Sequence, residues 1–194
     1  EQVHICLALP GSSQLEDSRY PQALVDTVLG GATSSRLFQE VREKRGLVYS
    51  IGSYSLSYRD GGLFLISAGT DAKNADEVLD LILKEVDSVR RNGLTDKELS
   101  WAKAYARGSL ALARESTSYR MQRLARAMLY EGRVVSHREY MHRFERVKPA
   151  QIDAFAERFF SSEPVIVVRQ HPVPAKREER IPAERQVEFY FFGG

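Results

Sequence analysis

The sequence has a single cysteine, Cys6, and no long apolar run. With one cysteine the chain can form neither an intrachain disulfide nor a thiolate metal cluster. Its apolar segments fall far short of the roughly 20 residues that a membrane-spanning helix needs, so we expect no membrane span. The scarcity of cysteine favours the cytoplasm, although a periplasmic protein without disulfides would have the same composition.

The chain also has little net charge. Its 28 Lys and Arg against 26 Asp and Glu leave a formal charge of +2, with both signs interspersed. Such a balance argues against nucleic acid or an anionic membrane as the main partner. The 43% hydrophobic content and the length of 194 residues are typical of one sizeable globular domain, or of two small ones sharing a core.

No zinc motif of the helical type occurs among the four histidines, which are His4, His137, His142 and His171. Such a motif needs two histidines four residues apart with a glutamate between them, as in H-x-x-E-H. His137 and His142 are five residues apart, which places them roughly 140° from each other around a helix. We therefore expect this chain to bind no metal and no cofactor.

Nucleophile and phosphate motifs are missing as well. There is no G-x-S-x-G elbow, and Cys6 is more typical of a small buried hydrophobic residue. The stretch "LGGATSSRL", residues 29–37, could hold an anion at a helix N-terminus. It lacks the lysine of a phosphate-binding loop and follows no strand, so a helix stop followed by a helix cap is favoured.

What the sequence does contain is a succession of strand and helix patterns. Alternating or β-branched runs predict strands, and an Asp60-Gly61 turn joins the second and third into a hairpin. Apolar residues at helical spacing predict helices between them. This order predicts an α+β fold, with helices packed on one face of a mostly antiparallel sheet. The strands are expected at residues 2–10, 47–58, 62–69 and 164–170, and the first two helices at residues 20–29 and 36–45.

Capping patterns place the remaining helices. A helix is expected to end before Gly93, and Thr95 with Glu98 predicts the start of a long helix that runs to about residue 131. Gly108 and the polar "ESTS", residues 115–118, predict bends in it. Further starts are predicted at Ser136, with Glu139 as its capping partner, and at Pro149, because proline suits the first position of a helix.

The last part of the chain differs in character. Residues 172–194 begin with a charged, proline-containing segment typical of an exposed linker, and end in the aromatic "VEFYFF". Two interpretations stay open for it, an added strand and a partly ordered terminus.

The stretch "REKRGLVYS", residues 42–50, raises a more specific question. Its simplest interpretation is a helix end whose cations offset the helix dipole, followed by a glycine and a strand. Arg42 and Tyr49 are then ordinary junction residues. The alternative is that they are held together for chemistry.

The chain resembles a known family over residues 1–171. The likeness is carried by residues 29–70, which include "LGGATSSRLFQEVREKRGLVYS", and continues through residues 75–132 and 147–160. These segments resemble the second, non-catalytic half of the pitrilysin, insulinase and mitochondrial-processing-peptidase zinc metallopeptidases. The resemblance implies an inactive peptidase domain at residues 1–171, with residues 172–194 outside it.

The resemblance also implies a role for two residues. In that family a catalytic half carries H-x-x-E-H and Zn²⁺, and the two halves close around an unfolded peptide. The second half contributes an arginine and a tyrosine seven residues apart, a spacing that falls here on Arg42 and Tyr49. They would bind the substrate carbonyl and stabilise the tetrahedral intermediate, whereas Lys44 and Arg45 remain junction cations.

Several alternatives stay open at this point. The catalytic half is expected either in the same longer chain or in a separate subunit, and homo-oligomers are compatible with both. A proteolytically inactive scaffold or peptide-binding subunit of the same fold is the second hypothesis. The presence of both Arg42 and Tyr49 favours the peptidase.

Overall fold

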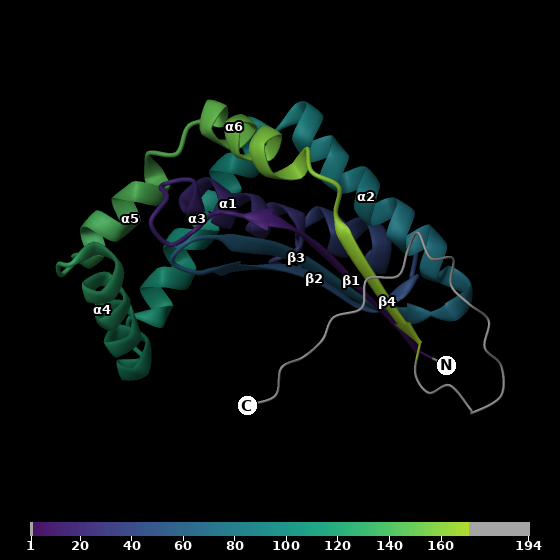
Figure 1. The fold of residues 1–194 in the computed structure, drawn as a ribbon, viewed down its shortest axis with the longest axis horizontal. Helices are drawn as coiled ribbons and strands as arrows, with labels where there is room; N and C mark the ends of the chain where they lie inside the picture. The colour runs from purple at the N-terminus through teal and green to yellow at the C-terminus, as the bar shows by residue number, and fades with distance from the viewer. Residues whose placement is uncertain (1, 171–194) are drawn as a thin grey trace.

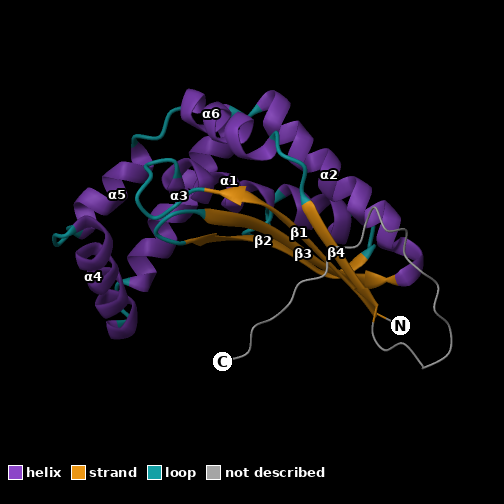
Figure 2. Ribbon diagram, viewed as in Figure 1, coloured by secondary structure: helices purple, strands orange, loops and turns teal. Residues whose placement is uncertain are grey.

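A four-stranded antiparallel sheet forms one layer of the molecule, and helices cover one of its faces (Figures 1 and 2). The computed structural model describes residues 2–170. The strand order is β2-β3-β1-β4. The strands are β1 (Gln2–Gly11), β2 (Val48–Ser57), β3 (Gly62–Asp71) and β4 (Val165–Gln170). The predicted α+β class and the predicted antiparallel sheet are confirmed.

The helical elements follow the predicted order, with one exception. They are α1 (Arg19–Leu29), the π-helix η1 (Phe38–Glu43), the 3₁₀ turn η2 (Ala72–Asn74), α2 (Ala75–Asn92), α3 (Asp96–Ala113), α4 (Thr117–Glu131), α5 (His137–Glu145) and α6 (Pro149–Phe160). The prediction of one long helix running to about residue 131 is wrong, although the break between α3 and α4 falls at the bend expected in residues 115–118. The Ser116 side chain accepts a hydrogen bond from the Tyr119 N–H and caps a new helix there. The chain stays helical through Gly108, because a single glycine weakens a helix without breaking it.

The caps show how local chemistry sets the helix starts. Thr95 and Glu98 form the predicted reciprocal capping box at α3. At α5 only half of the predicted box forms. Ser136 accepts from the Glu139 N–H, but the Glu139 carboxylate binds Arg133 and Arg143 instead of the backbone. A stronger ionic partner has displaced the weaker backbone one.

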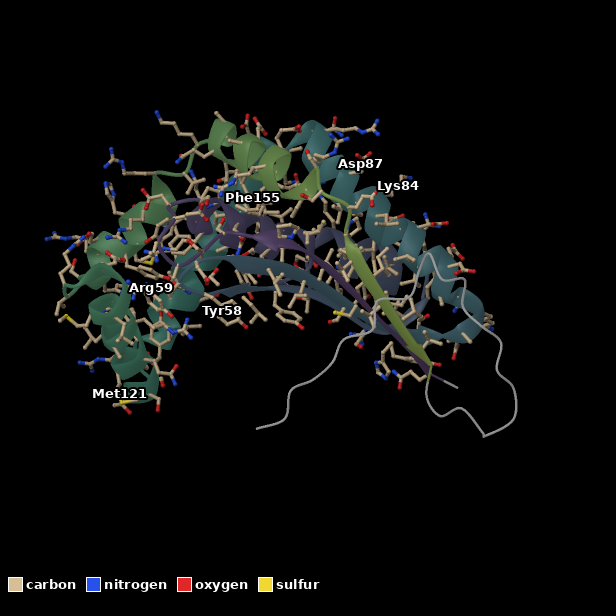
Figure 3. All side chains as sticks on the ribbon, in the orientation of Figure 1. Tyr58, Arg59, Lys84, Asp87, Met121 and Phe155 are labelled. Carbon is tan, nitrogen blue, oxygen red and sulfur yellow. The ribbon has the colours of Figure 1, made fainter. Side chains whose placement is uncertain are left out.

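The core lies between the sheet and helices α1, α2 and α6. The inward side chains of β1 and β3 alternate along each strand and are buried, as the pleat requires. From the other side α6 adds Phe155, which Figure 3 labels between that helix and the sheet, and Phe160, whose ring meets Phe64 edge-on at 5.1 Å. Lys84 on α2 and Met121 on α4 point away from this core.

Some predictions cannot be compared with this structure. Residues 171–194 lie outside the described residues, and with them His171, the end of the proposed domain and the "VEFYFF" segment. Within residues 2–170, no helix is both long and apolar enough to cross a membrane.

Candidate functional site

Arg42 and Tyr49 lie on either side of a left-handed glycine. Arg42 is in the last turn of η1, and Tyr49 is the second residue of β2. Between them Gly46 has φ of 65°, a conformation that costs a side chain roughly 1–2 kcal/mol. The Gly46 N–H donates to the Arg42 carbonyl at 3.0 Å and the Leu47 N–H to the Val41 carbonyl at 3.1 Å. These two bonds end the helix and direct the chain into the strand.

Both flanking elements depart from regular geometry. Residues 38–43 form a π-helix, which is rare and frequently found at functional sites. In β2, Val48 pairs with Thr70 and Ser50 with Gly69, so Tyr49 is the extra residue of a β-bulge. A bulge redirects a side chain, and both Tyr49 and Ser50 are exposed. Each member of the pair is therefore presented by a backbone irregularity, which sequence periodicity cannot reveal.

Arg42 differs from its neighbouring cations in its contacts. Lys44 and Arg45 both bind the Glu40 carboxylate at 2.9 Å. The exposed Arg42 instead lies over the ring of Phe38, with 4.9 Å from its guanidinium carbon to the ring centroid. Within residues 2–170 it forms no ion pair. The Arg42 guanidinium is thus held by stacking while its N–H donors stay available.

Tyr49 is held through its hydroxyl. Its side chain is 57% exposed, and its O–H donates to Asp71 Oδ1 at 2.6 Å. This hydrogen bond to the Asp71 carboxylate raises the pKa of Tyr49 above its ordinary value of 10.0. The neighbouring Thr70 is fully buried and donates its hydroxyl to the Leu47 carbonyl. The last two residues of β3 therefore hold both the backbone that follows Gly46 and the Tyr49 hydroxyl.

The structure shows no hydrogen bond between Arg42 and Tyr49 among the described residues; each has its own partner, Phe38 and Asp71. Neither residue lines the cavity of about 420 Å³ beside α1 and α5 or the cavity of about 430 Å³ between α1, β2 and α4. The pair therefore lies on an open surface. Donors in such a position reach their full electrostatic strength only when a second body excludes water.

The outward side of the sheet carries a set of exposed apolar side chains although no helix of residues 2–170 covers it (Figure 2). Tyr54 pairs with Leu65 and Leu56 with Leu63, so these side chains share that side. We call it the open face; its exposed apolar residues are Tyr54, Leu56, Leu63, Val165 and Val167. Tyr49 lies at one end of the open face. Its partner Asp71 and the open-face residue Leu63 are separated by an even number of positions on β3, so their side chains lie on the same side of the sheet.

The side of β2 that faces the helices is unexpectedly polar toward the C-terminal end of the strand. Ser53, Ser55 and Ser57 point toward the helices, whereas Tyr54 and Leu56 between them are exposed. The alternation in "SYSLSY" predicts a strand but not which side is buried. An apolar set facing outward is the signal for a surface that another body covers.

A buried carboxyl group lies behind these serines. Ser53 donates its hydroxyl to Asp26 Oδ1 on α1. Burial raises the pKa of Asp26 from its ordinary 3.8 to about 6, against the lowering effect of the Ser53 and Ser55 hydroxyls. The sequence analysis missed this group, since nothing in "ALVDTVL" marks Asp26 as buried.

An ionic cluster fixes α4 and α5 to the start of α1. The Glu131 carboxylate accepts from Arg143 at 2.8 Å and from Arg19 at 2.9 Å. Both guanidinium groups also donate to the Tyr20 hydroxyl, at 2.7 and 2.8 Å. These side chains are about one-fifth exposed, so water weakens the bonds only in part. The cluster holds the α4–α5 arm against the body of the molecule.

No group of three or more His, Cys, Asp or Glu side chains in residues 2–170 is arranged to hold a metal ion. His137 begins α5 and His142 lies near its end. The side chains present here do not fit a zinc site.

Comparison with known proteins gives consistent results. Residues 1–105 match the family described as the peptidase M16 inactive domain. A protein named uncharacterized zinc protease from Streptomyces coelicolor is 38% identical, over 87% of this chain and 37% of its own. One from Bacillus subtilis is 35% identical, over 84% of this chain and 40% of its own. The chain thus spans about two-fifths of the length of these curated relatives.

A solved structure agrees with the sequence relatives. The crystal structure titled peptidase M16 inactive domain from Pseudomonas fluorescens matches with a TM-score of 0.73 and 27% identity. The match covers 86% of this chain and 40% of that one.

Proposed function

Because this chain belongs to the family of peptidase M16 inactive domains, we propose that it is the non-catalytic half of a zinc endopeptidase that hydrolyses unfolded peptides. In this proposal it closes over a catalytic half, in the same longer chain or a separate subunit. Arg42 and Tyr49 then complete the active site from the opposite side.

The observation that carries this proposal is the presentation of the two side chains. A π-helix and a β-bulge, both uncommon, flank one left-handed glycine and expose one hydrogen-bond donor each. Such irregularities cost stability and tend to be kept where they position a functional group. An ordinary helix-to-strand junction needs neither of them.

The open face supports closure against a second body. Its apolar side chains are between 36% and 45% exposed in this chain. Burying them removes apolar surface from water, at roughly 25 cal/mol per Å². Closure over this face would also cover the surface next to Tyr49 and exclude water there, which the chemistry requires.

The chemical roles follow from the donors. Peptide hydrolysis places negative charge on the former carbonyl oxygen, and one preorganised donor there is worth about 3–4 kcal/mol. Arg42 supplies a permanently charged fork and Tyr49 a neutral O–H. The Tyr49 proton is directed at Asp71 in this structure, so the phenol turns it toward the substrate oxygen when the peptide binds. A Zn²⁺ ion in the catalytic half supplies the activation of water.

One observation favours a second candidate, a scaffold or peptide-binding subunit without turnover. The Asp71 carboxylate engages the Tyr49 proton, and an apolar open face also suits a permanent subunit contact. The two candidates differ in whether the complete protein hydrolyses peptides at all.

The experiment compares Tyr49→Phe with wild type in the complete protein, which contains this chain, its catalytic half and zinc. We expect kcat/KM on an unfolded peptide to fall about 100-fold or more, because one transition-state donor is lost. Tyr58→Phe is the matched control, since Tyr58 is 56% exposed, like Tyr49, but lies in the β2–β3 turn. An unchanged kcat/KM for Tyr49→Phe would exclude the proposed role of Tyr49, whereas no hydrolysis by the complete wild-type protein would favour the scaffold.

A further inference from the structure

A cavity of about 430 Å³, lined by aromatic as well as charged side chains, lies between α1, β2, α4 and α5. Its walls include Asp26 from α1, Tyr54 and Ser55 from β2, and Arg123 and Arg126 from α4. Figure 1 shows α4 projecting beyond the sheet at the end where the β2–β3 hairpin turns. Tyr54 belongs both to this wall and to the open face, so the cavity lies beside the surface proposed to close against the catalytic half.

The cavity holds more cationic than anionic groups without a charged partner. Glu131 also lines it, but Arg19 and Arg143 neutralise that carboxylate. Arg123 uses one N–H on the Val135 carbonyl at 2.7 Å. Within the described part of the chain neither Arg123 nor Arg126 forms an ion pair. Two guanidinium groups therefore keep donors for a ligand.

The remaining walls suit a ligand that is anionic and partly planar. Tyr130 and Tyr140 are aromatic residues of the cavity lining. The Ser55 hydroxyl lies beside Asp26 and lowers the pKa of that carboxyl group. Besides Glu131, Asp26 is the other carboxyl group in the lining, and its charge would repel an anionic ligand. It accepts a hydrogen bond from the Ser53 hydroxyl. Guanidinium forks match carboxylates in shape as well as in charge.

We propose that this cavity binds a carboxylate of the substrate peptide, about five residues from the bond that is cut. The position rests on the proposed role of Tyr49. Tyr49 and Tyr54 are five residues apart on β2, or about 17 Å at 3.3 Å per residue. An extended peptide running along β2 covers that distance in about five residues. The recognised carboxylate belongs to an Asp or Glu side chain, or to the C-terminus of a short peptide.

Binding of peptides to the 194-residue chain tests the chemistry without catalysis. Fluorescence anisotropy compares a labelled peptide carrying Glu with the same peptide carrying Gln. We expect the Glu peptide to bind about tenfold more tightly, as for one charge-assisted hydrogen bond at a half-exposed site. In Arg126→Gln this preference is expected to vanish. Equal affinity of both peptides for wild type would overturn the proposal.

Arg120→Gln is the matched control. Arg120 is exposed on the same helix, six residues before Arg126, and does not line the cavity. It should keep the full preference for Glu. If Arg120→Gln loses the preference as Arg126→Gln does, the effect is a general attraction to α4 and the cavity is not the site. A peptide without Glu is also compared in two forms, one with a free and one with an amidated C-terminus. Tighter binding of the free form would show that the site takes a terminal carboxylate, and equal binding that it takes a side-chain carboxylate.

The complete protein tests the spacing separately. Scanning Glu along an unfolded peptide should raise kcat/KM most about five residues from the cut, through a lower KM. Arg126→Gln should remove that optimum and leave kcat unchanged. If Tyr49→Phe proves neutral while Arg126 still decides the binding of the Glu peptide, the catalytic proposal fails and the carboxylate site stands. A flat Glu scan overturns the spacing.

Discussion

Replacing Asp26 by Asn should make the protein more stable at neutral pH and leave it nearly unchanged in acid. Burial raises the pKa of Asp26 to about 6 from an ordinary value of 3.8. Between these values the folded state binds a proton that the unfolded state has lost, so stability falls as pH rises through this window. Above pH 6 the carboxylate is charged and buried, and this charge destabilises the fold.

The two pKa values set the magnitude of the effect. One pKa unit corresponds to 1.36 kcal/mol, so the rise from 3.8 to about 6 amounts to about 3 kcal/mol at pH 7.5. Because Asp26 lines a cavity that water enters, this is an upper value. An Asn at this position carries no charge, and its carbonyl oxygen still accepts the bond from Ser53.

Urea unfolding at pH 4.5, 5.5, 6.5 and 7.5 measures this difference. The free energies of unfolding of wild type and Asp26→Asn should already differ by about 1 kcal/mol at pH 4.5, and the difference should grow to nearly its full value by pH 6.5, with equal m-values. Asp80→Asn is the control, because Asp80 is exposed on α2. Curves for wild type and Asp26→Asn that stay parallel across this range would refute the assignment of a buried, destabilising charge.

Two further substitutions test the framework of the site. Glu131→Gln should lower the free energy of unfolding by about 2 kcal/mol in urea titration, because it weakens the charge-assisted bonds from Arg19 and Arg143; a loss below about 0.5 kcal/mol would mean that the cluster contributes little. Gly46→Ala should cost about 1–2 kcal/mol through the left-handed backbone alone, since no atom lies within 4 Å of an added Cβ. In the complete protein it should also lower kcat/KM, and an unaffected kcat/KM would show that the glycine does not orient Arg42 and Tyr49.

Local signals predicted the helix starts well, as Thr95 and Pro149 illustrate. Their side chains act within three residues, so the sequence contains the whole interaction. Ser136 shows the limit of such reasoning. Its partner Glu139 also has Arg133 and Arg143 within reach, and these arginines lie close only after α4 and α5 have packed.

Features that depend on what covers a surface were beyond sequence reasoning. The alternation around Tyr54 gives the period of the strand, but the buried side follows from the helices on one face of the sheet. The buried state of Asp26 likewise follows from its contact with Ser53, 27 residues away. The positions of Arg42 and Tyr49 came from a family resemblance, and neither the π-helix nor the bulge has a recognised sequence pattern.

The junction between η1 and β2 has a consequence for how this protein can change in evolution. A π-helix and a β-bulge each accommodate one residue more than a regular helix or ladder would. Deleting one residue from either element would restore regular hydrogen bonding there. It would also turn Arg42 by roughly 100° or move Tyr49 to the opposite side of the sheet. In this segment the length of the chain is therefore as constrained as the identity of its side chains, unlike in an ordinary surface loop, where insertions and deletions are tolerated.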